Sequence, residues 1–321
     1  RYLDEFLMDG RVIDSPYLLR LLLVRGFILR KRPRQSAEAY QKIWTAEGSP
    51  LIVNSRRLEQ QVAKLWNAPV ALGMRYGNPS IAAGLEQLQQ QGVESVIVVP
   101  LYPHYAMSSY ETAVEKARTV AARSKGAPRL HFLAPFYDHK AYRRVLAENT
   151  RPHLEGEWDH LLFSFHGVPL RHITSSDPAG DHCMSCDDCC FDDHPSISTC
   201  YRAQVRRSAR FLADDLSIPE HRWSVAYQSR LGNDPWLQPS TEATVVRLAQ
   251  QGVRRLKVIC PAFVADCLET IEEIDGRARN TFLEAGGEQF ETVPCLNAEP
   301  AWARALVEMA SDALPSQVDA T

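Results

Sequence analysis

Six short apolar runs constrain the fold more than any other feature of this sequence. The runs are rich in β-branched residues, they do not alternate with polar residues, and stretches of helical periodicity separate them. This pattern is typical of parallel strands that helices cover on both faces. The predicted strands are 93–101, 130–136, 161–165, 223–227, 256–260 and 290–294, and the helical stretches include 81–91, 110–124 and 241–251. The sequence therefore predicts a doubly wound α/β fold.

A weak internal repeat indicates two such domains. Residues 88–112 contain a helix end, Gly92, an apolar strand, a proline and a loop that reaches Glu111-Thr112. Residues 248–270 have the same order of features and end at Glu269-Thr270. Repetition at half the chain length predicts two similar Rossmann-like domains with a cleft between them. We expect domains at 1–150 and 151–297, with helix 298–315 packing back on the first and a strand upstream of Arg1.

Charge and hydropathy exclude several classes of protein. The net charge of −3 argues against a nucleic-acid-binding surface. No run of about 18 uncharged apolar residues predicts a membrane-spanning helix, and no secretion signal opens the sequence. We therefore expect a cytoplasmic protein.

A histidine follows one of the buried strands directly. His166 stands in Ser164-Phe165-His166-Gly167-Val168-Pro169, at a sharp turn where a parallel sheet binds its ligands. An imidazole there can exchange protons near neutral pH. A histidine that merely ends the strand is equally compatible with the pattern.

Two acidic residues follow another strand. Glu269 and Glu273 are four residues apart on one predicted helix face. Directed at a cleft, they would attract a divalent cation or collect protons. Without other information, a solvated acidic face is the simpler interpretation.

A third segment combines polar and aromatic residues. The strand ending at Tyr227 is followed by Ser229 and, seven residues later, by Trp236. A flat aromatic ligand would suit this arrangement, and so would ordinary packing of a buried tryptophan.

Taken together, these motifs resemble those of the ferrochelatases. The resemblance includes Gly73-Met74-Arg75-Tyr76-Gly77, Pro100-Leu101-Tyr102-Pro103-His104-Tyr105, and Trp44 to Gly48-Ser49-Pro50-Leu51, in order, over nearly the whole chain. It implies an enzyme, a lyase, that inserts Fe²⁺ into protoporphyrin IX in the last step of haem biosynthesis. Its substrates would be the porphyrin and ferrous iron, with no nucleic acid involved.

The resemblance also implies roles for single residues. His166 would face the porphyrin centre as base or iron ligand, with Glu269 on the opposite side as the other iron contact and Glu273 continuing an acidic track. Insertion releases two N–H protons, so the site needs bases, and mixed imidazole and carboxylate ligation lets iron bind and leave. Two departures from the family pattern are Cys267, where many relatives have histidine, and Arg277, where some have a third acidic residue.

A second group of residues would hold the porphyrin. Residues 18–29 alone indicate an amphipathic or core helix, and in the family they form an apolar lip over the porphyrin mouth. Basic residues beside the lip would pair with propionates, and the lip itself could rest on a bilayer. The predicted substrate-binding residues are Arg30, Lys31, Arg32, Arg75, Tyr76, Tyr102, Ser229 and Trp236.

Five of the eight cysteines fall within 18 residues, in a predicted insertion at 181–200. In a large chain without a secretion signal, such clustering indicates a metal site that binds Zn²⁺ or an iron–sulfur cluster. Some bacterial ferrochelatases carry a [2Fe–2S] cluster here. That resemblance implies Cys183, Cys189, Cys190 and Cys200 as ligands, with Cys186 as the alternative and Zn²⁺ as the alternative metal.

Two other functions share parts of this pattern. A chelatase that loads cobalt or nickel into another tetrapyrrole would have the same fold. A two-lobed metal or haem carrier would lack an obligatory base in the cleft and would carry an export signal. The histidine and glutamate motifs, together with the lip, favour iron and a dicarboxylate porphyrin.

Overall fold

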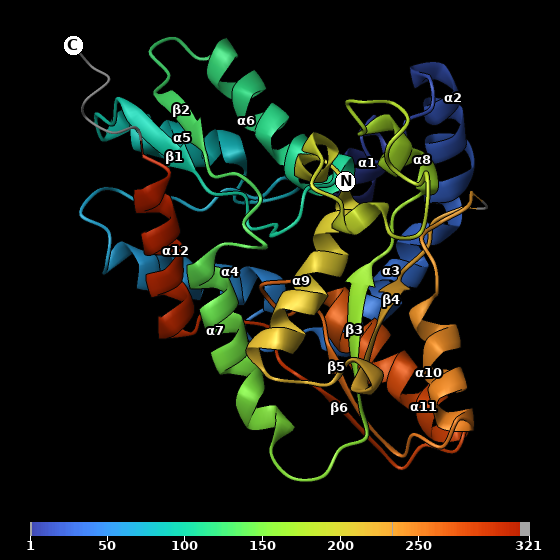
Figure 1. Ribbon diagram of the computed structural model, residues 1–321. Coiled ribbons are helices and arrows are strands. Elements are labelled where there is room, and N and C mark those ends of the chain that lie inside the picture. Colours follow the sequence, from blue (N-terminus) through green and yellow to red (C-terminus); the bar gives the residue numbers. More distant parts are fainter. Residues whose placement is uncertain (1, 233, 315–321) are drawn as a thin grey trace.

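Two parallel sheets organise the chain in the computed structural model, which describes residues 2–232 and 234–314. In the first sheet, β1 (Ser95–Val98) pairs with β2 (Arg129–Phe132). In the second, β3 (His160–His166) lies between β4 (Trp223–Gln228) and β5 (Arg255–Ile259), and β6 (Gln289–Thr292) pairs with β5. The six predicted strands are confirmed, and the sheets are visible as separate groups of arrows in Figure 1.

The central strand β3 shows why these runs lacked alternation. Leu161, Phe163 and Phe165 are fully buried in one apolar cluster, whereas Leu162, also fully buried, belongs to another. The first cluster includes residues of α7 (Lys140–Thr150), α9 (Tyr201–Asp215) and α12 (Pro300–Asp312), and the second includes residues of α10 (Thr241–Gln250) and α11 (Arg279–Glu284). Helices cover both faces, as predicted. Each such buried side chain contributes about 1.5–3 kcal/mol.

The internal repeat is also present in the structure. Helices α5 (Ile81–Gln90) and α10 both begin after a serine, Ser80 or Ser240, whose side chain accepts a hydrogen bond from the backbone N–H three residues on. Both helices end in the same way, with the N–H of Val93 or Val253 bonded back to a leucine carbonyl. Each repeat then enters the strand, β1 or β5, that pairs with the next strand of its sheet.

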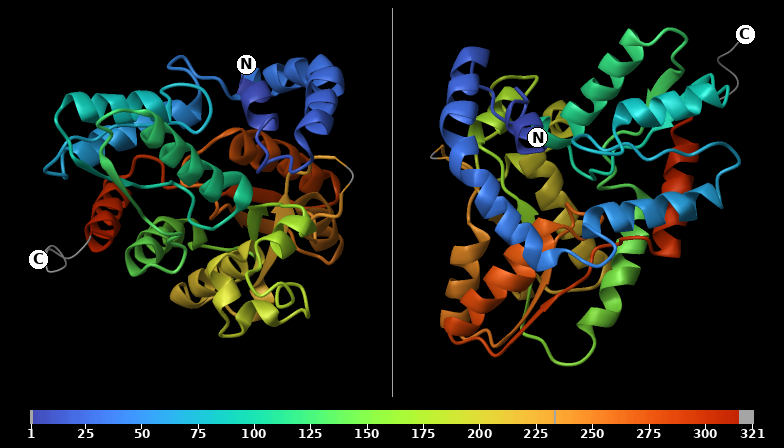
Figure 2. Two further views of the ribbon diagram at one scale, coloured as in Figure 1. Left: turned by 90° about the horizontal axis from the view of Figure 1, so that it is seen from above. Right: turned by 180° about the vertical axis from the view of Figure 1, so that it is seen from behind.

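The N-terminal helices form an arm beside the sheets. The arm contains α1 (Tyr2–Leu7), α2 (Tyr17–Leu21), a π-helix η1 (Leu22–Ile28) and α3 (Leu29–Ile43), and Figure 2 shows it running along one side of the molecule. The predicted helix at 18–29 is therefore mostly π-helical. A cluster of Leu7, Ile13 and Val24 fixes the inner face of the arm.

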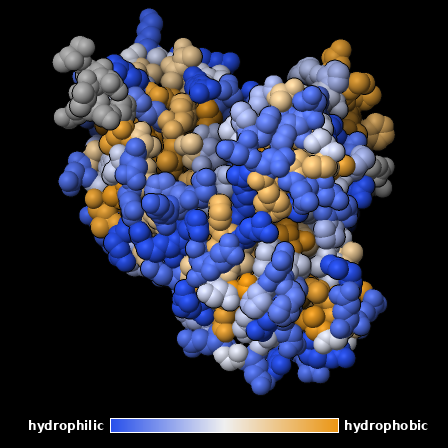
Figure 3. All heavy atoms as spheres, viewed as in Figure 1, coloured by the Kyte–Doolittle hydropathy of each residue, from blue (hydrophilic) through white to orange (hydrophobic). Residues whose placement is uncertain are grey.

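The outer face of the arm is apolar and open to solvent. Leu18 is 76% exposed and Phe27 is 67% exposed, and Tyr17, Leu19 and Leu22 are exposed beside them. Apolar side chains gather at the upper right of Figure 3, over α2. The interpretation of these residues as a core helix is therefore wrong. Within residues 2–232 and 234–314, no helix combines the length and hydropathy needed to cross a membrane.

The remaining elements connect these parts. Helix α12 packs against α4 (Pro50–Ala63) and against α7, as Figure 1 shows. The other elements are the π-helices η2 (Met107–Glu111) and η7 (Glu269–Ala278), the helices α6 (Thr112–Arg123) and α8 (Leu170–Ser175), and the short 3-10 helices at Arg151–Leu154, Cys189–Phe191, Pro195–Ser198 and Glu220–Arg222.

Candidate active site

His166 is the last residue of β3 and stands on a tightly fixed turn. The N–H of Gly167 donates to the carbonyl of Gln228, the β4 partner of His166, at 2.7 Å. The Nδ1 atom of His166 lies 2.6 Å from the carbonyl oxygen of Gly167. A carbonyl can only accept, so this contact is a hydrogen bond when Nδ1 carries the proton. In the neutral imidazole, Nε2 is then the free base.

The turn after His166 requires glycine. A Cβ at Gly167 would lie 3.1 Å from the Trp236 ring and 3.2 Å from the carbonyl oxygens of Gln228 and Ser229. The imidazole lies between two aromatic rings, with its centroid 6.4 Å from those of Trp236 and Phe263. The indole N–H of Trp236 is buried and has no partner among the described residues. The predicted aromatic environment at Trp236 is therefore beside the histidine.

Glu269 begins the π-helix η7 and is joined to the histidine turn by Gln228. The side-chain amide of Gln228 donates to the Glu269 carbonyl at 2.9 Å and accepts from the hydroxyl of Ser164 on β3 at 2.7 Å. Cys267 is buried and its thiol is hydrogen-bonded to Glu269. Burial, together with the Glu269 charge, raises the pKa of Cys267 far above its ordinary value, so the thiol stays protonated.

The acidic side chains further along η7 are paired rather than solvated. The carboxylate of Glu273 accepts from Ser229 at 2.5 Å and lies 3.2 Å from Arg277. The side chain of Glu272 is 10% exposed and contacts both Arg277 and Lys42 of α3. The simpler interpretation of a solvated acidic face is therefore wrong. π-Helices are rare and often occur at functional sites.

A cavity of about 560 Å³ reaches the start of η7 at Glu269, whereas His166, Trp236 and Glu273 are not among the residues that line it. Apolar side chains of α4, α5, β1 and α12 line most of it, and Arg75, Tyr102 and Glu269 contribute polar groups. Two lining residues, Tyr2 and Tyr40, were missed by the sequence reasoning. They hydrogen-bond each other, and burial followed by the charge of Glu269 raises the pKa of Tyr40 to about 12. Nothing in the surrounding sequence marks these two tyrosines as site residues, and only the packing of α1 and α3 places them at the cavity.

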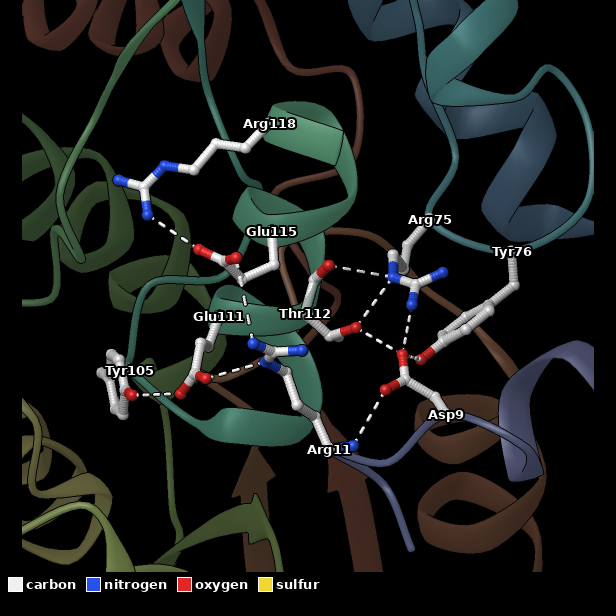
Figure 4. Close-up of polar contacts among 9 residues, drawn as sticks. All are labelled: Asp9, Arg11, Arg75, Tyr76, Tyr105, Glu111, Thr112, Glu115 and Arg118. Atoms are coloured by element: carbon white, nitrogen blue, oxygen red, sulfur yellow. Dashed lines mark hydrogen bonds and ion pairs between the residues drawn. The ribbon is translucent and has the colours of Figure 1, made fainter. Parts of the chain in front are cut away.

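Arg75 is held in place by a carboxylate that the sequence analysis did not identify. Asp9, with a side chain 6% exposed, accepts from Arg75, from the hydroxyl of Tyr76 at 2.9 Å and from Thr112 (Figure 4). The Nε of Arg75 also donates to the Thr112 carbonyl at 3.0 Å, and its guanidinium stacks on Tyr76. Asp9 was hidden because its side-chain partners lie 66 or more residues away.

The same network fixes the base of the arm. Arg11 donates through Nε to Glu111 at 2.7 Å, and Glu111 accepts from Tyr105 on its other oxygen (Figure 4). Further out, Arg30 and Arg32 are exposed on α3, and the side chain of Lys31 lies outside the described part of the structure.

The cysteine loop, residues 176–200, lies against α9. Four predicted ligands, Cys183, Cys189, Cys190 and Cys200, are at most 7% exposed, whereas Cys186 is exposed. The thiols of Cys183 and Cys190 each form a hydrogen bond with Cys200. No three cysteine, histidine or acidic side chains in the described ranges are arranged to hold a metal ion as they stand.

Several groups tie the cysteine loop down. Arg207 of α9 donates to the Cys190 carbonyl at 2.8 Å, and Arg202 lies with Nη1 3.7 Å from Cys189 Sγ. Asp177 accepts from the N–H groups of His182 and Cys183. The donor chemistry of the buried thiols fits Zn²⁺ or an iron–sulfur cluster.

Comparison with known families decides what kind of protein this is. The family model for ferrochelatases matches residues 1–314. The chain belongs to the ferrochelatase family.

Curated ferrochelatases match at about half identity. The ferrochelatase of Pseudomonas fluorescens (strain Pf0-1) is 50% identical over 311 residues, which are 96% of this chain and 91% of that protein. The ferrochelatase of Azotobacter vinelandii is 51% identical over 311 residues, 96% of this chain and 92% of that protein. Membership in the ferrochelatase family identifies this protein as an enzyme of that family and confirms the predicted resemblance.

Solved structures support the fold. SirB from Bacillus subtilis, with Fe³⁺, has a TM-score of 0.54 at 14% identity and covers 83% of this chain and 92% of its own. A SirB structure with cobalt, from the subspecies spizizenii, has a TM-score of 0.51 at 12% identity, with 81% and 87% covered. These similarities confirm a chelatase-type α/β fold for this ferrochelatase, while the roles of its site residues stay predictions.

Proposed function

We propose that this enzyme inserts Fe²⁺ into protoporphyrin IX, forming protohaem and releasing two protons, at the cleft between domains 1–150 and 151–297. One observation carries the proposal. Gln228 connects a histidine that has a free Nε2 to a glutamate at the start of a π-helix, beside an apolar cavity. The packing of α12 on α4 supports the expected return of the C-terminal helix to the first domain.

His166 is the proposed base and iron contact. Its Nδ1 is occupied by the Gly167 carbonyl, so Nε2 is the nitrogen that accepts a pyrrole proton or binds Fe²⁺. Glu269 is the second iron contact in this proposal. Glu273, which accepts a hydrogen bond from Ser229, is the proposed acceptor of the second proton. A borderline imidazole nitrogen and a hard carboxylate together would bind Fe²⁺ without retaining it.

The cavity and the arm would bind the macrocycle. Tyr102 lines the cavity and Trp236 lies beside His166, and both offer aromatic surfaces. Arg30 and Arg32, which are exposed on α3, and Lys31, their neighbour in the sequence, would pair with the propionates beside the lip. Arg75 lines the cavity, and Asp9 holds it together with its neighbour Tyr76. Gripping a flat porphyrin in a bent shape exposes a nitrogen lone pair, and contacts around the ring supply the free energy for that distortion.

The test is anaerobic insertion of Fe²⁺ into protoporphyrin IX, followed by the haem spectrum. We expect turnover by the wild type and none by His166→Ala, while His221→Ala, an exposed histidine in the 3-10 helix before β4, keeps full activity. Parallel assays with cobalt, nickel and coproporphyrin determine the metal and tetrapyrrole. Activity in His166→Ala equal to that of the wild type would refute the assigned base.

We further propose that the cysteine loop binds a [2Fe–2S] cluster through Cys183, Cys189, Cys190 and Cys200. The burial of these four thiols and the exposure of Cys186 support this ligand set over one that includes Cys186. Such a cluster would supply tightly bound thiolate cross-links within the loop. Iron and sulfide analysis with visible absorption tests it, and one equivalent of zinc in a colourless protein would favour the alternative metal.

The exposed face of the lip is proposed to rest on a bilayer. Its apolar side chains project from α2 and η1 beside the basic start of α3. We expect Leu18→Ser/Leu22→Ser to weaken binding to anionic phospholipid vesicles at least five-fold, with thermal stability unchanged because both side chains are already exposed. Leu283→Ser, an exposed leucine on α11, is the matched control. Equal vesicle binding by all three proteins would refute the proposal.

A further inference from the structure

The first turn of α9 connects the cysteine loop to the turn that carries His166. Helix α9 begins at Tyr201, directly after Cys200. The hydroxyl of Tyr201 donates a hydrogen bond to the main-chain carbonyl of His166, with 2.8 Å between the two oxygen atoms. Tyr201 is buried, so water competes little for this bond. A single side chain therefore joins the last cysteine of the loop to the histidine.

This bond holds one half of a peptide unit whose other half is held by β4. The peptide between His166 and Gly167 has its carbonyl bonded to Tyr201 and its N–H bonded to the Gln228 carbonyl. Rotating the peptide plane would break both hydrogen bonds. The imidazole contacts the Gly167 carbonyl through Nδ1, and this carbonyl directly follows the fixed peptide unit, so the orientation of the unit contributes to the direction of Nε2.

The first turn of α9 is itself tied to the cysteine loop. Gln204, buried on the same turn as Tyr201, donates to the carbonyls of Ile197 and Ser198 at 3.0 Å. Its side-chain oxygen accepts from the N–H of Tyr105 at 2.6 Å. Disorder in the loop therefore reaches Tyr201 through its covalent neighbour Cys200 and through Gln204.

We propose that Tyr201 is a positioning residue for His166, and that it makes the geometry of the histidine turn depend on the order of the cysteine loop. The inference rests on the proposed role of His166 in iron insertion. Tyr201 performs no chemistry and donates one hydrogen bond. A carbonyl oxygen can only accept, so the phenol of Tyr201 is the donor in this bond.

Steady-state kinetics of Tyr201→Phe test the positioning role. We expect kcat to fall roughly ten-fold with KM for porphyrin unchanged, because one hydrogen bond is lost from the turn and none from the cavity wall. Tyr110→Phe is the matched control, since its hydroxyl also donates to a main-chain carbonyl, that of Leu133 at 3.0 Å. A Tyr201→Phe enzyme with the wild-type kcat overturns the proposal.

Amide hydrogen exchange at Gly167 tests the link to the cysteine loop without turnover. We expect Cys190→Ser to increase exchange at least five-fold and Cys186→Ser to leave it unchanged, since Cys190 is buried and Cys186 is exposed. In a Tyr201→Phe background, Cys190→Ser should add nothing. Unchanged exchange in Cys190→Ser, or an equal increase in both backgrounds, overturns the link.

A second variant keeps the experiment decisive if Cys190→Ser does not fold. Arg207→Ala removes the guanidinium that bonds the Cys190 carbonyl and leaves every thiol in place. We expect Arg207→Ala to increase amide exchange at Gly167 as well, and to add nothing in the Tyr201→Phe background. A folded wild type that inserts no iron would refute the proposed function alone, because the exchange measurement needs no substrate.

Discussion

The side chain of Gln228 spans the gap between β3 and the π-helix η7, donating to the carbonyl of Glu269 at 2.9 Å while accepting from Ser164 at 2.7 Å. Gln228 is 4% exposed, so both bonds lie in the protein interior. One amide group therefore links the histidine strand to the first glutamate of η7.

Replacing that amide should damage both stability and catalysis. Gln228→Leu keeps the volume but removes the amide donor to the Glu269 carbonyl and one of the two partners of the Ser164 hydroxyl, which keeps Thr241, and we expect a cost of about 1–3 kcal/mol. We expect a lower urea midpoint and a kcat reduced at least ten-fold. Gln89→Leu is the control, because its amide bonds the Lys125 carbonyl on the surface. A fully active Gln228→Leu enzyme would show that the bridge does not matter for catalysis.

His104 should make the protein less stable in mild acid. Its ring is buried among Tyr137, Phe165 and Tyr201, both nitrogens lack partners among the described residues, and burial lowers its pKa to about 3. In the unfolded chain this histidine has its ordinary pKa of about 6.5 and binds a proton between pH 7 and pH 5, whereas in the folded protein it stays neutral over that range. Stability should therefore fall by roughly 2 kcal/mol between pH 7 and pH 5 from this residue alone.

The variant His104→Phe tests that origin of the pH dependence. It keeps an aromatic ring in the pocket and removes the titrating group, so the loss of stability between pH 7 and pH 5 should shrink. Urea unfolding at both pH values measures it, with His221→Gln as the exposed control. If His104→Phe lost as much stability between pH 7 and pH 5 as the wild type, the acid sensitivity would come from other groups.

Asp9 should stabilise the fold only when ionised. Burial opposes its ionisation, but Thr112, the Arg11 N–H, Arg75 and Tyr76 together hold the pKa of Asp9 below its ordinary value. A carboxyl group whose pKa is lower in the folded than in the unfolded chain stabilises the fold at any pH above its pKa in the unfolded chain. This stabilisation is lost as the pH falls through the pKa of the folded state.

We therefore expect Asp9→Asn to be less stable than the wild type by about 1–3 kcal/mol at pH 7, with the difference shrinking as the pH falls below the ordinary carboxyl pKa of about 3.9. Asp4→Asn, which breaks only the exposed pair with Arg25, should change little. Thermal unfolding across pH measures both variants. A difference that persists unchanged at low pH would contradict the electrostatic explanation.

Loss of one thiol should loosen the cysteine loop. If Cys189 is a ligand, Cys189→Ser removes a cross-link between the loop and α9, and the melting temperature should fall by at least 5 °C. Cys186→Ser should melt like the wild type because Cys186 is exposed. Differential scanning calorimetry on the protein as purified makes the comparison. Equal melting temperatures for Cys189→Ser and the wild type would count against ligation.

The sequence predicted the sheets well because their signal is local. An uninterrupted run such as Leu161 to Phe165 needs burial on both faces, and β3 has it. The position of His166 and Glu269 also follows locally, from strand ends. Asp9 and Tyr40 could not be found, since their importance comes from partners far away in the chain. The π-helical turns at η1 and η7 were missed for a similar reason, because a helical period does not specify the hydrogen-bonding step.

Glu111 and Glu269 occupy corresponding positions in the two repeats, each at a π-helix that follows a strand and a proline. Glu111 is bound by Arg11 and Tyr105 at the base of the arm, whereas the side chain of Glu269 borders the cavity. The two repeats therefore place their glutamates in different surroundings, since Glu111 anchors the base of the arm and Glu269 lines the cavity. Exchanging the two segments between the halves would put Glu269 at the base of the arm and Glu111 at the cavity, so the arm would keep its anchor only if Glu269 paired with Arg11 as Glu111 does.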